Sequence, residues 1–141
     1  ERNPDNVAGI IAFEAAGANP TQGGFGGGAP TITEWTTEPR LPADFRAVDR
    51  DGCSMQGDNP SRLVNYTGLQ IVLVATEHGT SSHDAIRCQA DVWNQAGADA
   101  RYVWLPALGL AGGGHFAMAQ LDNGAYAEAF IDIAEEIERQ N

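Results

Sequence analysis

The sequence predicts an α/β fold in which parallel strands are flanked by helices. Three apolar segments, residues 7–13, 69–76 and 100–106, are typical of strands, and the first has the composition of a strand covered on both faces. Apolar residues at helical spacing follow the second and the third of these segments. Strands that alternate with helices indicate a parallel sheet, and a chain of 141 residues corresponds to about one domain.

The first predicted strand is "VAGIIAF", residues 7–13, which ends at Glu14. The segment after it, residues 15–62, contains most of the prolines and many of the glycines and shows no periodicity. We expect a long irregular excursion there, with at most one short helix. Loops of this length inside a compact domain are usually functional or are insertions.

The second strand, "LQIVLVAT" at residues 69–76, leads into a predicted helix. The candidates for the N-cap of this helix are Ser81, Ser82 and Asp84. Its apolar residues recur at helical spacing, at Ile86, Ala90 and Trp93. Ala96 and Gly97 then provide a C-terminal signal.

The third strand, residues 100–106, stops at Pro106 and is followed by the glycines 112–114 and by His115. A closing helix is predicted from "GAYAEAFIDIAEEIERQ", residues 124–140. One face of it carries the side chains of Tyr126, Phe130, Ile133 and Ile137. Most of its acidic residues lie elsewhere, so the helix is amphipathic.

Residues 7–13 have the composition of a central strand rather than of an edge strand. A buried strand needs a hydrogen-bonded neighbour on each side. We do not expect three strands and two or three helices to cover both faces of such a sheet, and the sequence reaches this strand almost at once. We therefore expect the second neighbour to come from other polypeptide, which makes residues 1–141 half of a larger domain.

The charge balance argues against several classes of partner. The chain has 8 basic and 19 acidic residues and a formal net charge of -11. Nucleic-acid binding and docking on anionic lipid both need a basic face, so neither is expected. No apolar run approaches the roughly 20 residues that span a bilayer, so no membrane segment is expected.

Two cysteines, Cys53 and Cys88, are compatible with one disulfide or with two buried thiols, and they leave the redox compartment open. Asn65 begins the triplet "NYT", an acceptor sequence for N-glycosylation. The triplet favours a secreted or periplasmic location.

His115 is the first candidate for chemistry. It follows the last strand, at the edge of the sheet where α/β proteins collect their active sites. The glycines before it allow unusual backbone angles and let another group come close. An imidazole titrates near neutral pH, so it suits a general base that later acts as an acid. The structural alternative is a loop histidine that caps a helix starting near Phe116.

Glu14 follows the first strand directly, at the same edge of the sheet. A carboxylate there can accept the Nδ1 proton of a histidine and fix its tautomer, although a turn residue or an ion-pair partner is the structural alternative. Glu77 and Asp84, after the second strand, compete for this role; Asp84 also fits a helix N-cap and Glu77 a solvated turn. His78 and His83 lie in the same loop, but "EHGTSSHD" matches no known ligand pattern, so no metal is predicted.

No activated nucleophile accompanies these two residues. The serines are Ser54, Ser61, Ser81 and Ser82. None of them lies in a G-x-S-x-G turn between a strand and a helix, and the two cysteines have no such turn either. The sequence therefore offers a candidate base and a candidate acid without a nucleophile.

Three segments together resemble the α/β-hydrolase family. They are "VAGIIAFEAAG", "IVLVATEHG" and "CQADVWNQAGADARYVWLPALGLAGGGHFAMAQLDN". Within the family they are most similar to esterases whose triad acid follows the sixth strand, and "LP-x-LG" leading to "G-x-G-H" is the most specific part. The resemblance covers residues 4–14 and 69–139, roughly the C-terminal half of such a domain.

The resemblance implies acyl transfer by a Ser-His-Glu triad on a small-molecule ester, with His115 as the base and Glu14 as the acid. The serine and the oxyanion donors would come from the N-terminal half of the same hydrolase, as a separate chain or a cleaved fragment, so the active form would be a heterodimer. "ERNPDNV" looks like the tail of the helix that follows this serine. No metal or organic cofactor is implied.

Residues 15–62 would then cover the substrate pocket, with Phe25, Trp35 or Phe45 as apolar wall. Two other functions stay open from the sequence. One is a non-catalytic binding or structural module of the α/β class, and the other is a lactonase or a peptidase on the same fold.

Overall fold

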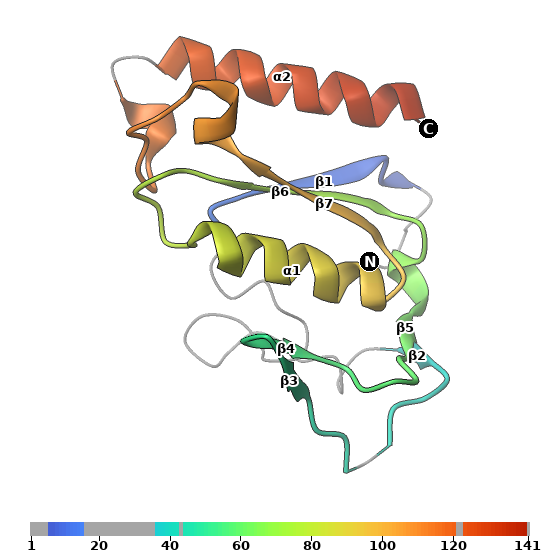
Figure 1. Cartoon of the computed structure of the whole chain (residues 1–141). Helices are drawn as coiled ribbons and strands as arrows, with labels where there is room; N and C mark the ends of the chain where they lie inside the picture. Colours follow the sequence, from blue (N-terminus) through green and yellow to red (C-terminus); the bar gives the residue numbers. More distant parts are fainter. Residues whose placement is uncertain (1–5, 16–35, 43, 121–122, 141) are drawn as a thin grey trace.

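The three predicted strands form one parallel sheet in a computed structural model that describes residues 6–15, 36–42, 44–120 and 123–140. The strands are β1 (Gly9–Phe13), β6 (Gln70–Ala75) and β7 (Asp99–Trp104), in the order β1-β6-β7 (Figure 1). Phe13 is aligned with Val74, and Ala75 is aligned with Trp104. The α/β class is confirmed, and the carboxyl ends of all three strands meet at one edge of the sheet.

Two α-helices of the described residues, α1 and α2, cover opposite faces of this sheet (Figure 1). Helix α1 (His83–Gln95) begins at Ser82, whose side chain accepts a hydrogen bond from the Ala85 amide, so Ser82 is the N-cap among the three candidates. Helix α2 is Asn123–Gln140. The residues just after His115 form a separate short 3-10 turn, Ala117–Ala119, so His115 does not cap α2.

The core lies on both sides of β6 because its side chains alternate between the two faces. Ile71, Leu73 and Ala75 pack in the cluster that contains the apolar residues of α1. Val72 and Val74 pack in the cluster that contains α2. The predicted face of α2 is confirmed, because Tyr126, Ile133 and Ile137 are buried. Phe130 packs edge-on against Phe13, with the ring centroids 5.4 Å apart. Burial on both faces explains why β6 is a continuous apolar run.

Strand β1 lies at an edge of the sheet, and β6 is its only partner among the described residues. All five residues of β1 are half-buried, in contrast to the almost completely buried β6. No second neighbour of β1 is present among the described residues, so the central position expected from its composition is not seen there. A further strand beside β1 remains a prediction.

The described part of residues 15–62 forms short antiparallel strands rather than a helix. Strand β2 (Thr37–Glu38) pairs with β5 (Arg62–Leu63), and β3 (Val48–Arg50) pairs with β4 (Cys53–Met55). These strands lie beyond α1, on the side away from the sheet (Figure 1). Of the three candidate wall residues, Phe45 packs against the core on the α1 side, and Phe25 and Trp35 lie outside the described residues.

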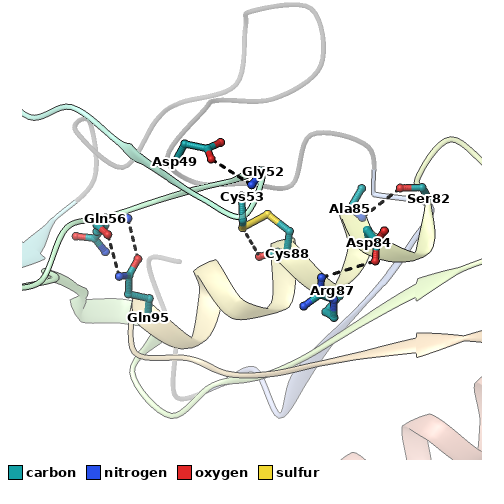
Figure 2. The surroundings of a disulfide bond; sticks show 10 residues. All are labelled: Asp49, Gly52, Cys53, Gln56, Ser82, Asp84, Ala85, Arg87, Cys88 and Gln95. Atoms are coloured by element: carbon teal, nitrogen blue, oxygen red, sulfur yellow. Dashed lines mark hydrogen bonds and ion pairs between the residues drawn. A yellow bond between two sulfur atoms is a disulfide. The ribbon is translucent and has the colours of Figure 1, made fainter.

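A disulfide between Cys53 and Cys88 attaches this excursion to α1, which settles the choice that the sequence left open (Figure 2). Beside it, the backbone amide of Gln56 donates a 2.8 Å hydrogen bond to Oε1 of Gln95, and Nε2 of Gln95 donates to the carbonyl oxygen of Gln56 at 3.1 Å. Covalent and polar links therefore hold the β3–β4 hairpin on the outer surface of the helix.

Candidate functional site

Glu14 is the first residue after β1, and its position is unusual in two respects. Its side chain is almost completely buried, with 3% of the residue exposed. Its φ of 48° lies in the left-handed region, which costs a residue other than glycine on the order of 1–3 kcal/mol. Backbone strain of this kind persists where surrounding contacts fix it, and it concentrates at functional sites.

The loop that follows β6 surrounds the Glu14 carboxylate with hydrogen-bond donors. Oε1 accepts from the amide and, at 2.7 Å, from the hydroxyl of Thr76. Oε2 accepts from the amide of Thr80 at 2.7 Å, from its hydroxyl at 3.2 Å and from the amide of Ser81 at 3.4 Å. Gly79 closes the loop over the carboxylate, and a Cβ atom at this position would collide with it.

These contacts determine the charge of Glu14. Burial, the largest single influence, acts to raise its pKa, because desolvation disfavours the charged form. The hydrogen bonds from Thr76, Thr80 and Ser81 act in the opposite direction and together hold the pKa below its ordinary value. The carboxylate is therefore negatively charged and fixed in place at neutral pH, as the acid member of a catalytic triad must be.

The glycine loop that carries His115 returns to the same edge of the sheet. The His78 amide donates a 2.8 Å hydrogen bond to the Gly113 carbonyl oxygen, and a parallel bridge joins His78 to Gly114. Gly112 adopts a φ of 79°, which glycine accepts without strain. Gly112 thus permits a backbone path that a larger residue would follow only with strain.

Thr76 connects the two candidate residues. Its hydroxyl donates to Glu14, and its methyl group lies against Gly113, where an added Cβ atom would be 3.1 Å from Cγ2. The same added atom would be 2.6 Å from Oη of the buried Tyr126, so Gly113 fits closely between α2 and the end of β6. Glu14 and the loop of His115 therefore pack on opposite sides of one side chain.

The His115 imidazole itself is exposed and touches the ring of Phe116, with centroids 4.7 Å apart. Within the described residues, no hydrogen bond or ion pair joins this imidazole to a carboxylate. Phe116 and Met118 beside it are 69% and 56% exposed. The structure thus brings the two backbone segments together, but it does not pair the side chains of His115 and Glu14.

The competing acids have other contacts. Oε2 of Glu77 accepts a 2.8 Å hydrogen bond from the Gly112 amide. Asp84 is exposed in the first turn of α1, and its Oδ1 lies 3.6 Å from a guanidinium nitrogen of Arg87. The His83 ring contacts the rings of Tyr102 and Trp104 in tilted arrangements, with centroids 5.4 and 5.2 Å apart. In the part of the chain that the structure describes, no three potential ligands gather around a common point.

Sequence reasoning missed the residues that hold Glu14. Thr76, Thr80 and Ser81 come from the segment "TEHGTSS", whose hydroxyl groups and glycine directly follow a buried strand. That density of small donors at a strand end was the available signal.

A groove of about 550 Å³ between β7 and α2 is a separate feature, because its lining includes neither Glu14 nor His115.

Neither described helix has both the length and the apolar content needed to cross a bilayer. Comparison of the chain with protein-family models, with curated proteins and with solved structures finds no match in any of the three.

Proposed function

We propose that this chain is the C-terminal half of a carboxylic ester hydrolase of the α/β-hydrolase type. His115 is the general base, Glu14 is the triad acid, and the nucleophilic serine belongs to an N-terminal half outside this sequence. The observation that carries the proposal is the arrangement at Thr76. A charged, buried carboxylate and a glycine loop bearing a histidine meet there, at the edge of a parallel sheet.

In the proposed reaction the serine hydroxyl attacks the ester carbonyl while the His115 imidazole takes its proton. Glu14 stabilises the imidazolium that forms, and His115 then protonates the leaving alcohol. Water activated by the same imidazole releases the acid. The exposed imidazole must turn toward Glu14 for this, and the N-terminal half would enclose it when it covers Phe116 and Met118.

The edge of β1 supports the need for a second piece of polypeptide. A parallel strand that is apolar on both faces is normally hydrogen-bonded on both sides. Ile10 and Ala12 face α1 and Ile11 and Phe13 face α2, yet all four are only half-buried. A strand of the N-terminal half beside β1 would complete their burial and form a heterodimer.

A secreted or periplasmic location also belongs to this proposal. The Cys53–Cys88 disulfide requires an oxidising compartment in most organisms, and Asn65 of the "NYT" triplet is exposed on a 3-10 turn. Both features are compatible with export.

The test is to extend the expressed chain with the coding sequence that precedes it and to measure hydrolysis of p-nitrophenyl butyrate. We expect activity in the extended protein and labelling of its serine by a fluorophosphonate probe. His115→Ala should abolish both without unfolding the protein. Hydrolysis of a lactone and of a peptide anilide by the same sample separates an esterase from a lactonase or a peptidase. An extended protein that folds but neither hydrolyses the ester nor reacts with the probe would refute the proposal.

One observation favours a second candidate function, a non-catalytic binding or structural module. The donors of the 76–81 loop already satisfy both oxygens of Glu14, so this carboxylate can serve as a structural link between β1 and that loop. Under this hypothesis His115→Ala leaves every property of the protein unchanged, whereas Glu14→Ala unfolds it. The activity of the extended protein distinguishes the two.

A further inference from the structure

We infer that Glu77 is a positioning residue, which fixes the glycine loop and thereby the place of His115. This inference rests on the proposed function, because it assigns Glu77 a part in the same reaction. Glu77 directly follows Thr76, the residue that contacts both Glu14 and Gly113. Its carboxylate reaches across to the loop and accepts a 2.8 Å hydrogen bond from the Gly112 amide.

Among the described residues, each of the three glycines before His115 takes part in at least one hydrogen bond. Glu77 holds the amide of Gly112, and the amide of His78 holds the carbonyl oxygen of Gly113 at 2.8 Å. The carbonyl oxygen of Gly114 accepts from the Ala117 amide at 3.0 Å. Among these three contacts, only the one from Glu77 uses a side chain, so a substitution can remove it alone.

The consequence for His115 follows from the flexibility of glycine. A run of glycines has more backbone freedom than any other sequence and is ordered only where contacts restrict it. Gly112 begins the run in the left-handed region, so its hydrogen bond to Glu77 selects the direction in which the loop leaves the preceding turn. Without this contact the loop would be less ordered, and the imidazole would no longer be held at the position that the proposed serine requires.

A positioning role differs from an acid role in what it demands of the side chain. A backbone amide needs only an acceptor oxygen, which glutamine also supplies. The acid of a triad must carry the negative charge that stabilises an imidazolium. The pair of variants Glu77→Ala and Glu77→Gln therefore separates the two roles.

The experiment measures kcat and KM for p-nitrophenyl butyrate in the extended, active protein. We expect Glu77→Ala to lower kcat by roughly 10- to 100-fold with little change in KM, because a small misplacement of a catalytic group has this effect. Glu77→Gln should restore kcat to within about threefold of the wild type. Glu138→Ala, which removes an exposed carboxylate from α2, is the matched control and should leave both constants unchanged.

Amide hydrogen exchange at Gly112, the amide that donates to Glu77, provides a readout that does not depend on activity. We expect faster exchange at this amide in Glu77→Ala and wild-type exchange in Glu77→Gln. Full activity in Glu77→Ala, or equal losses in the two variants, would overturn the positioning role. A wild-type protein without activity would instead refute the proposed function. In that case the exchange rates alone decide whether Glu77 anchors the loop.

Discussion

The hydroxyl of Thr76 donates a 2.7 Å hydrogen bond to Oε1 of Glu14, 62 residues earlier in the chain. The backbone amide of Thr76 donates to the same oxygen. One residue at the end of the central strand thus saturates one oxygen of a buried carboxylate, while its methyl group packs against Gly113 on the other side. The candidate site is built around Thr76 rather than around Glu14 or His115, the two residues for which we propose catalytic roles.

Replacement of Thr76 by valine should destabilise the protein, because it removes the hydroxyl donor and keeps the methyl group against Gly113. A hydrogen bond to a charged group contributes about 1.5–3 kcal/mol, so we expect a loss of this size in the free energy of unfolding, measured in urea. Without this donor the pKa of Glu14 should also rise, which an NMR titration of its carboxyl carbon will show.

Thr76→Ser is the matched variant, since it keeps the hydroxyl and removes only the methyl group. We expect it to leave the pKa of Glu14 close to the wild-type value and to cost about 0.5–1.5 kcal/mol through lost packing. Equal shifts of the Glu14 titration in the two variants would show that the hydroxyl is not what holds the carboxylate.

The pKa of Glu14 gives stability a definite dependence on pH. Because the folded state lowers this pKa from its ordinary value of 4.5, the ionised group stabilises the fold fully above that value. The contribution is lost as the pH falls below 4.5 and through the folded-state pKa. The difference in unfolding free energy between the wild type and Glu14→Gln should therefore narrow steadily in acid, as urea titrations between pH 7 and 3 would show. A difference that stays constant over this range would mean that the charge of Glu14 does not stabilise the fold.

The sequence was sufficient to predict the elements that show a continuous apolar run or apolar residues at helical spacing. The run "LQIVLVAT" indicated a strand, and β6 (Gln70–Ala75) lies within it. The spacing of Tyr126, Ile133 and Ile137 indicated which face of the last helix is buried. Local patterns of this kind report on solvent exposure, and exposure is decided largely within each element.

The surroundings of Glu14 could not be predicted in the same way. Its hydrogen-bond partners lie 62 to 67 residues away, and nothing local to "AFEAAG" identifies them. The left-handed φ of Glu14 was equally hidden, because a glutamate does not favour this conformation and long-range contacts impose it. The same applies to β2–β5, whose two- and three-residue strands are too short to show periodicity.

The disulfide should stabilise the chain without forming part of the candidate site. It closes a loop with a sequence separation of 35 residues, and a bridge of this span contributes about 2–5 kcal/mol. We expect the double variant Cys53→Ser/Cys88→Ser to lose stability by this amount in urea and to be cleaved by protease in the β3–β4 hairpin. Amide protection in β6 should persist under native conditions. Unchanged stability in the double variant would show that the Gln56–Gln95 contacts suffice to hold the hairpin.

Two neighbouring glycines before His115 should respond very differently to alanine. At Gly113 the new Cβ atom would lie 2.6 Å from Oη of Tyr126 and 3.1 Å from Cγ2 of Thr76, both on buried side chains. At Gly114 the nearest atom, the carbonyl oxygen of His78, would be 3.7 Å away, which is an ordinary contact. Overpacking of this kind costs about 1–3 kcal/mol, so Gly113→Ala should lose stability by that amount and Gly114→Ala by less than about 0.5 kcal/mol.

In the extended protein, Gly113→Ala should also lower the rate of ester hydrolysis, because relief of the clash moves the loop that carries His115. Thermal and urea denaturation of both variants, together with their rates on p-nitrophenyl butyrate, check this expectation. Equal losses of stability and activity in Gly113→Ala and Gly114→Ala would mean that the loop accommodates a Cβ atom at Gly113 without cost. Its close fit between Thr76 and Tyr126 would then not be what places the imidazole.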